Sequence, residues 1–250
     1  MTDRTNPASL KSRPSLLGRL RWILAAQLVA LAVVLGAPMP LGLPAQVAVA
    51  ATTSDGIVYE QREPGTVAIT GYEGAGGRVE IPAQLEGLPV TSVADGAFSL
   101  NTSITEVSIP EGVLSVGNET FNDCVKLSSV ELPASLSSIG DGAFYGCASL
   151  ASIAVPGTVA DWGDYVFSSC ERLESVRIGE GVDRVPTRSF IGDSLLSSVE
   201  LPSSVKLIEK NAFRSCGSLA TCDLSHVGRL KHGPLLARLV QVQALDHMLR

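Results

Sequence analysis

The stretch that decides the fold covers residues 127–147 and has the sequence LSSVELPASLSSIGDGAFYGC. At its start, the apolar side chains of Val130 and Leu132 alternate with Glu131, which is the pattern of a β-strand with one buried and one exposed face. Pro133 has no N–H group to donate to a neighbouring strand, so we expect the strand to end at this proline. The first part of the stretch therefore predicts a short, half-buried strand.

The second part of the stretch returns toward the same interior. Leu136 and Ile139 provide two more buried positions, and we expect Asp141 to open a short helical turn. That turn would carry Phe144 and Cys147 into the core. A unit of this size cannot bury its own apolar face, so it has to stack against similar units.

Similar units are present, because the sequence repeats with a period of 23 residues. All six phenylalanines obey this spacing, at Phe98, Phe121, Phe144, Phe167, Phe190 and Phe213. A proline, or once a glycine, obeys it at Pro110, Pro133, Pro156, Gly179 and Pro202. Four of the five cysteines do so at Cys124, Cys147, Cys170 and Cys216. The period predicts a repeat solenoid over 79–225, with ladders of like residues and about 4.8 Å between adjacent strands.

The repeat pattern, L-x-x-V-x-[IL]-P-x-x-[VL]-x-x-I-G-x-x-A-F-x-x-C, resembles that of the bacterial surface-antigen (BspA-like) leucine-rich repeat family. The segments VAITGY at 67–72 and GLPVT at 87–91 resemble the usual entry into the repeats of that family. The resemblance implies an α/β-type leucine-rich repeat solenoid, mostly β with short helical turns. It also implies a place at the cell surface, because members are associated with adhesion to host or matrix proteins and with cell–cell contact.

The first 50 residues have the composition of an export segment. Residues 1–21 are polar and basic, no charge occurs from Trp22 to Ser54, and an A-x-A pattern at 48–50 suits a signal peptidase. Pro38, Pro40 and Pro44 would break a long helix, which favours a cleaved signal peptide. The uncharged run is also long enough to cross a bilayer, so an uncleaved N-terminal anchor is the alternative. Both place residues 51–250 outside the cytoplasm, with membrane contact only through an uncleaved N-terminus.

Two segments flank the repeats. At 51–78, Pro64-Gly65 suits a turn between strands near Ile57–Tyr59 and Val67–Ile69, so we expect a β-hairpin that covers the open edge of the first coil. At 226–250 the repeat is lost, and one helical face is suggested by Leu235, Leu239, Val242, Leu245 and Leu249. This atypical segment is either a capping helix or an unrelated end of a truncated array.

Composition excludes several functions. Residues 51–250 carry 14 basic and 24 acidic side chains, a balance that repels phosphate backbones and argues against nucleic-acid binding. All three histidines, His226, His232 and His247, lie in the last 25 residues, so none within the repeats can activate a serine. No G-x-S-x-G motif is present either. We therefore expect neither catalytic residues nor a cofactor.

The cysteine ladder allows three interpretations in an exported chain. Zinc needs thiolates that converge tetrahedrally, whereas cysteines of a ladder point the same way. Neighbouring rungs are close enough for a disulfide by Cα distance, but parallel side chains keep the Cβ atoms apart. Cysteine is also a small residue that is readily buried. We favour buried free thiols, keep a disulfide as the alternative, and expect no metal.

Acidic residues recur just before the phenylalanine turn. The position holds Asp95, Asn118, Asp141 and Asp164, followed by Thr187 and Lys210. Stacked carboxylates can bind calcium, but Asp and Asn also cap helical turns, and a lysine fits a row of caps better than a calcium site. We therefore predict caps.

The fifth unit has Asp193 where its neighbours have cysteine. Because a buried carboxylate is costly unless it is protonated or finds donors, we expect Asp193 to turn toward solvent. Ile191 or Leu195 would then fill the space.

The exposed position of the strand is the candidate ligand surface. It holds Ser108, Glu131, Arg177 and Glu200, with Glu80, Ala154 and Asp223 at the equivalent places of other units. Solenoids offer extended faces for binding, but the same stripe also suits a solvated surface that keeps the coils soluble.

Taken with the resemblance, these features predict an exported, non-catalytic repeat protein, secreted or held at the cell surface. Its expected role is to bind a protein partner, and the family resemblance points to a host or matrix protein. The alternative is a structural spacer that displays other modules and has no ligand of its own.

Overall fold

The computed structural model describes residues 50–230, apart from 63 and 221. The chain divides into two compact units, Met1–Ala50 and Ala51–Arg250. The signal peptide or anchor predicted for 1–50 lies outside the described residues except for residue 50, and so do residues 231–250 of the atypical segment predicted for 226–250, with its possible capping helix. In the described part of that segment, residues 229–230 form a strand that continues the repeat pairing. Within the described part of the chain, no helix is long and apolar enough to cross a membrane.

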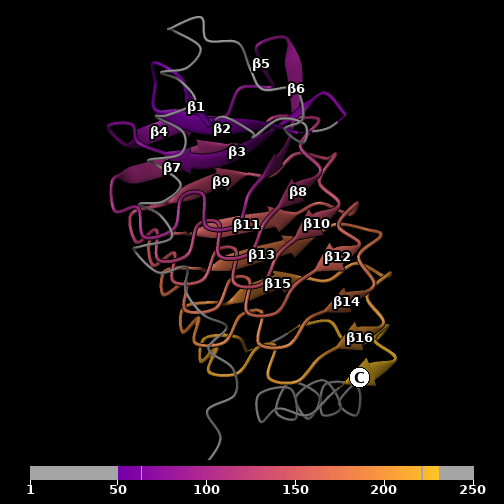
Figure 1. Ribbon diagram of the computed structural model, residues 1–250. Coiled ribbons are helices and arrows are strands. Elements are labelled where there is room, and N and C mark those ends of the chain that lie inside the picture. Colours follow the sequence, from indigo (N-terminus) through magenta and orange to yellow (C-terminus); the bar gives the residue numbers. More distant parts are fainter. Residues whose placement is uncertain (1–49, 63, 221, 231–250) are drawn as a thin grey trace, which may run out of the picture. The chain divides into compact units, whose positions relative to one another are not determined.

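The second unit is a β-solenoid in which the coils add strands to two rows, visible side by side in Figure 1. The first row consists of β4 (Gly77–Glu80), β7 (Ile104–Ser108), β9 (Ser129–Glu131), β11 (Ser152–Val155), β13 (Ser175–Ile178) and β15 (Ser198–Glu200). The second row consists of β6 (Leu88–Val93), β8 (Ser115–Val116), β10 (Ser138–Ile139), β12 (Asp161–Trp162), β14 (Arg184–Val185), β16 (Leu207–Ile208) and β17 (Arg229–Leu230).

Strand pairing within the rows is parallel and keeps the period of the sequence. Ser152 of β11 pairs with Ser175 of β13, 23 residues further on. The first step is longer, because Arg78 pairs with Glu106, 28 residues further on. The extra length forms β5 (Gln84–Leu85), which pairs antiparallel with β6. The last step is shorter, because Leu207 pairs with Arg229, 22 residues further on.

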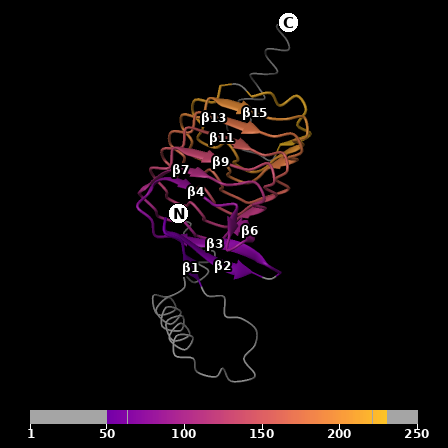
Figure 2. The same cartoon turned by 90° about the horizontal axis from the view of Figure 1, so that it is seen from above.

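A hairpin covers the first coil, as the sequence predicts. β2 (Ile57–Arg62) and β3 (Thr66–Tyr72) pair antiparallel, and β3 also pairs in parallel with β6 of the first coil. β1 (Ala51–Thr52) adds to the other edge of β2. Figure 2 shows these three strands at one end of the stack and β15 toward the other. The hairpin therefore pairs a strand edge that would otherwise be open.

The turns that carry the phenylalanines are not helical, so the expectation of short helical turns is wrong for the described residues. Gly142 and Gly146 have positive φ angles of 59° and 69°, which interrupt a right-handed helix. The N–H groups of Gly142, Phe144 and Gly146 each donate, at 2.9 Å, to a carbonyl oxygen of the next coil. Because these bonds run between coils and not along a helix, each turn is a further rung of the solenoid.

The six phenylalanines form one continuous stack in the core. Each ring is at most 2% exposed, and consecutive ring centroids lie 4.9–5.6 Å apart with interplanar angles of 6–17°. Tyr72 of the hairpin continues the stack, 5.6 Å from Phe98. Trp162 meets Phe167 and Phe190 edge-on at 6.3 and 6.1 Å. The core thus extends from the hairpin through the coils as a single apolar column.

Gly179 replaces the repeat proline for a steric reason. A Cβ atom at this position would lie 2.4 Å from the backbone nitrogen of Gly157 and 2.9 Å from its Cα. Neither proline nor any other residue with a Cβ fits at that distance without a shift of the neighbouring coil. The glycine therefore allows the two coils to approach closely.

Candidate functional site

The outward-facing side chains of the first-row strands form one surface, which we call the strand face. It comprises the half-buried Ser108 and the exposed Arg78, Glu80, Glu106, Ser129, Glu131, Ser152, Ala154, Ser175, Arg177, Ser198 and Glu200. Along each strand these residues alternate with buried ones such as Val130 and Val176, so the pleat separates surface from core.

The structure brings the predicted stripe together as two pairs. Ser108 pairs in register with Glu131, and its Oγ donates a hydrogen bond to Glu131 Oε2 at 3.1 Å. Arg177 pairs with Glu200, and Arg177 Nε lies 3.5 Å from Glu200 Oε2. The small side chain of Ala154, in register with Arg177, lies on the strand between the two pairs. The result is a row of charges that are all open to solvent.

The ion pairs on the strand face do not hold the fold. The side chains of Arg177 and Glu200 are 77% and 69% exposed, and exposed pairs of this kind contribute only about 0–1 kcal/mol. Arg78 makes two similar contacts, to Glu80 at 3.1 Å and to Glu106 at 3.7 Å. The charges of the strand face can therefore be changed with little effect on the core.

A cleft that sequence reasoning missed lies at the hairpin end of the strand face. It has a volume of about 270 Å³ and is lined by Asp55, Ile57, Tyr72, Arg78, Val79 and Glu80. Ile57 and Val79 are buried and give it an apolar floor, whereas Asp55, Arg78 and Glu80 are exposed charges. The sequence predicts only a covering hairpin here, because the two sides of the cleft come from segments with no shared motif.

The cysteines form a ladder of buried thiols. All five are free in the structure. The Sγ atoms of four of them donate to the carbonyl oxygen of a phenylalanine in the preceding coil, in the pairs Cys124–Phe98, Cys147–Phe121, Cys170–Phe144 and Cys216–Phe190, at 3.0–3.4 Å. Burial raises the pKa of the Cys124 thiol to about 12, and it raises the pKa of Cys147 and Cys170 well above the usual value. These thiols are therefore neutral and unreactive.

The acidic positions before the phenylalanine turns link coils and do not cap helices. Asp95 Oδ1 accepts from the backbone N–H of Asn118, Asn118 Oδ1 from that of Asp141, and Asp141 Oδ1 from that of Asp164, each at 2.8 Å. The prediction of helix caps is wrong in this respect, because no helix follows. The side chains nevertheless satisfy backbone N–H groups, as caps do, but in the next coil.

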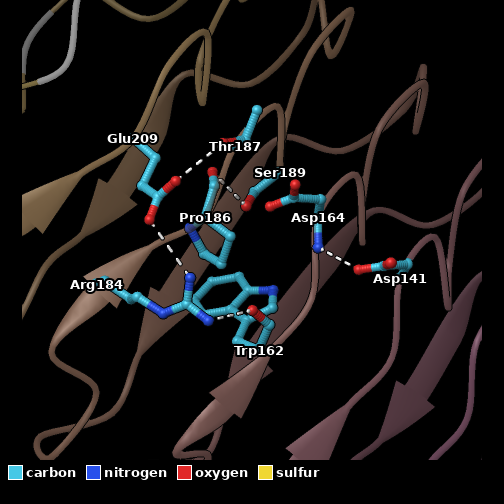
Figure 3. A network of polar contacts seen from close by, with 8 residues as sticks. All are labelled: Asp141, Trp162, Asp164, Arg184, Pro186, Thr187, Ser189 and Glu209. Atoms are coloured by element: carbon cyan, nitrogen blue, oxygen red, sulfur yellow. Dashed lines mark hydrogen bonds and ion pairs between the residues drawn. The ribbon is translucent and has the colours of Figure 1, made fainter. Parts of the chain in front are cut away.

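Beyond the Asp141–Asp164 link of this ladder, a network of polar side chains connects the next coils (Figure 3). Arg184 donates to the Trp162 carbonyl oxygen at 3.1 Å and lies 3.4 Å from Glu209 Oε1. Thr187 Oγ1 donates to Glu209 Oε2 at 2.9 Å. Burial raises the pKa of the Asp164 carboxyl, as do the nearby charges of Asp141 and Glu209, against the opposing effects of a Thr187 backbone hydrogen bond and Arg184.

The network stabilises the fifth coil and forms no metal site. Thr187 and Ser189 stand where the unit at 127–147 has Asp141 and Ala143. The Ser189 Oγ donates to the Pro186 carbonyl oxygen at 2.9 Å. Within the described residues, no group of three or more His, Cys, Asp or Glu side chains could hold a metal ion. The polar side chains here are accordingly internal partners of one another.

The prediction that Asp193 turns toward solvent is wrong. Its side chain is fully buried, whereas Leu195, expected to fill the space, is 47% exposed. Asp193 Oδ1 accepts from the backbone N–H of Cys170 at 2.8 Å. Desolvation raises the pKa of this carboxyl to about 8, even though the backbone N–H groups of Cys170 and Ser169 act in the opposite direction. The backbone N–H of Asp193 donates to the Phe190 carbonyl oxygen at 3.4 Å, as the N–H of Cys147 does to Phe144, so the position keeps the inward direction of the ladder.

Two rows of parallel strands at a 23-residue step, a proline or glycine after the first strand, and ladders of Phe and Cys define a leucine-rich repeat solenoid. Residues 91–220 match the model of the BspA type leucine-rich repeat region in six copies. The chain therefore belongs to the BspA type leucine-rich repeat family.

Solved structures of bacterial leucine-rich repeat proteins are similar to this chain. A leucine-rich cell surface protein from Faecalibacterium prausnitzii is 30% identical, with a TM-score of 0.63 over 76% of this chain and 51% of that protein. The T. pallidum leucine-rich repeat protein is 34% identical, with a TM-score of 0.57 over 76% of this chain and 81% of that one. A Bacteroides ovatus leucine-rich repeat protein is 27% identical, with a TM-score of 0.50 over 72% and 52%.

The chain thus spans about half the length of the F. prausnitzii and B. ovatus proteins. A search of curated proteins gives no match.

Proposed function

We propose that this is an exported protein whose strand face binds a protein partner at the cell surface. Membership in the BspA type family and the similarity to a protein described as a cell surface protein support its place outside the cytoplasm. The export segment predicted for 1–50 agrees with that place. The proposal concerns binding and not catalysis, because the described residues are organised as repeats of a packing unit.

The observation that carries the proposal is the register of exposed charges on parallel strands. Glu131, Arg177 and Glu200 occupy one repeat position, and strand pairing holds Arg177 directly beside Glu200. None of the three packs in the core, and the Arg177–Glu200 ion pair is too exposed to contribute much to stability. An extended partner could contact several coils at once, as solenoid faces allow, and the cleft beside β4 could take one of its side chains.

The partner class that we propose is an extracellular protein of the host or its matrix. A rigid row of charges of defined order selects partners by electrostatic complementarity. The alternative function is a spacer, in which the strand face only keeps the stack soluble. The binding function predicts a partner whose binding depends on Glu131, Arg177 and Glu200, whereas the spacer predicts no partner.

The test immobilises the full-length protein and measures association of purified matrix and host-surface proteins by surface plasmon resonance. The test variant carries Glu131→Lys, Arg177→Glu and Glu200→Lys. We expect it to fold normally and to associate at least about tenfold more slowly at low salt, with a smaller difference at high salt. Circular dichroism checks the fold of each variant.

A matched control carries Asp161→Lys, Asp183→Lys and Lys206→Glu, which make the same change of net charge at exposed positions in or next to the second row. Binding that survives in this control but is lost in the test variant supports the strand face. Equal binding by both variants places the contact elsewhere. No binding to any protein of the panel favours the spacer.

A further inference from the structure

Asp193 lies in a ladder whose four thiols each donate a hydrogen bond to the preceding coil. The ladder position holds Asn101, Cys124, Cys147, Cys170, Asp193 and Cys216. Each of the four thiols donates to a phenylalanine carbonyl oxygen 26 residues earlier in the chain. Counting 26 residues back from Asp193 gives Phe167. The Phe167 carbonyl oxygen is therefore the acceptor that this position of the ladder would use.

The hydrogen bonds around Asp193 leave that acceptor open. In other coils the cysteine N–H donates to the phenylalanine carbonyl of its own turn, as Cys147 does to Phe144 at 3.3 Å. The Cys170 N–H instead donates to Asp193 Oδ1 at 2.8 Å. The second carboxyl oxygen, Oδ2, is buried and has no hydrogen-bond partner.

A carboxylate does not suit this environment, but a carboxylic acid does. An ionised group would leave a charge on a buried oxygen without a donor, which costs several kcal/mol or more. Around the carboxyl lie the thiols of Cys170 and Cys216 and the backbone N–H groups of Cys170 and Ser169. None of these groups carries a positive charge. The Cys170 N–H donates to Oδ1, whereas the Ser169 N–H donates to the Ile191 carbonyl oxygen at 2.9 Å, which leaves Oδ2 without a hydrogen bond.

We propose that Asp193 is a protonated carboxyl that replaces the thiol of its ladder, with Oδ1 accepting from Cys170 and Oδ2–H donating to the Phe167 carbonyl oxygen. In this form every polar atom of the side chain is paired. Loss of the proton at higher pH removes the donor and places a charge in the core. The fifth coil is then the part of the stack that opens as the pH rises.

The direction of the pH dependence follows from proton linkage. Burial raises the pKa of folded Asp193 to about 8 from the ordinary value of 3.8 that applies to the unfolded chain. Between these values the folded protein holds a proton that the unfolded chain has released, so the stability from this group is complete below about pH 4 and falls as the pH rises toward 8. Above that pH the dependence levels off.

The opening would reach the strand face, because Asp193 lies in the same coil as β13, between Arg177 and Glu200 in the chain. β13 of this coil pairs directly with β15 of the next coil and holds Arg177 beside Glu200. This consequence rests on the proposed function, whereas the protonation of Asp193 does not. Failure of the binding assay and failure of the titration below are therefore separate results.

The direct test is a carbon-13 NMR titration of the aspartate carboxyl signals in the full-length protein, with Asp193→Asn assigning the signal that disappears. We expect that signal to titrate near pH 8, far above the ordinary value near 4. A signal for Asp193 that titrates near pH 4 would overturn the proposal.

Stability gives the second test. In Asp193→Asn, the amide can accept from Cys170 and donate to Phe167 without titrating, as the protonated acid does. The unfolding equilibrium constant of the native protein should rise about tenfold per pH unit relative to this variant between pH 5 and 7.5. The control Asp183→Asn removes an exposed carboxyl of the same coil and should keep the native pH dependence. Parallel pH profiles for the native protein and Asp193→Asn would refute the proposal.

Discussion

Replacing Phe144 with alanine tests whether the ring stack holds the coils together. The ring is fully buried and lies between Phe121 at 5.1 Å and Phe167 at 5.3 Å. Truncation of a buried phenylalanine costs about 3–5 kcal/mol, and each stacked pair adds about 0.5–1.5 kcal/mol beyond the burial of area. Because two stacked pairs are lost, we expect a cost of about 4–5 kcal/mol, near the top of that range.

Such a loss is a large part of the total stability of an ordinary domain, which is about 5–15 kcal/mol. Each coil rests on its neighbours, so the coils on both sides of Phe144 should melt with it. Phe144→Leu keeps most of the buried volume and loses only the stacking, so it should cost about 1–3 kcal/mol. The two variants together separate burial from ring contact.

The assay is a urea titration followed by circular dichroism and by the fluorescence of Trp162, which is buried against Phe167 and Phe190. Trp22→Phe removes the other tryptophan, so that the signal comes from one site. Tyr145→Ala is the control, because that side chain is 36% exposed beside the same turn, and it should change stability by no more than about 0.5 kcal/mol. A cost below about 1 kcal/mol for Phe144→Ala, far under the range for buried rings, would refute the reasoning.

Two further predictions concern the thiols and the close approach of coils. The protein unfolded without reductant should titrate five thiols, because all five cysteines are free, and a count lower by two would demonstrate a disulfide. Gly179→Ala should cost about 1–3 kcal/mol in the same urea titration, since its Cβ would lie 2.4 Å from the Gly157 nitrogen. Gly217→Ala, with nothing within 4 Å of the new Cβ, is the matched control, and equal effects of the two substitutions would show that the approach at Gly179 is not tight.

The sequence predicts the period, the buried positions and the hairpin because each depends on a local pattern. Val130 alternates with exposed neighbours, and Phe144 recurs at a constant step, so both are assigned to the interior without knowledge of the coil shape. The step itself then fixes which residues meet, as for Arg177 and Glu200. The predicted stripe is therefore a consequence of register alone.

The form of the turns could not be predicted in the same way. Glu119 and Tyr165, at the position of Gly142, have positive φ angles of 52° and 59°, which side chains other than glycine rarely adopt. Their backbone conformation is imposed by hydrogen bonds to the next coil, such as Tyr165 N–H to the Thr187 carbonyl oxygen at 3.1 Å. A local sequence pattern contains no information on such bonds, so an Asp followed by Gly suggests a helix that does not form.

The error at Asp193 has a related cause. From the residue type alone, the cost of burying a carboxylate favours an outward side chain. In the stack, however, the Asp193 side chain points inward and is fully buried, and the Cys170 N–H donates to its Oδ1. The side chain can then lower its cost by holding a proton, which the position in a ladder of neutral donors favours. The sequence allows a buried Asp193 that is protonated or finds donors, but it does not show that the Cys170 N–H supplies a donor at this position.

The distinction between inward and outward positions of the strands also applies to the proposed binding surface. Packing accounts for the inward residues, but it does not require any particular charge at Glu131, Arg177 or Glu200, whose side chains are exposed. Solubility alone would be served by acidic residues throughout, in keeping with the net charge of the chain. Arg177 reverses the sign within the stripe and lowers its net charge. If the proposed function is correct, this ordered change of sign on a rigid face is the feature by which a partner is selected, so Arg177→Glu alone should weaken binding.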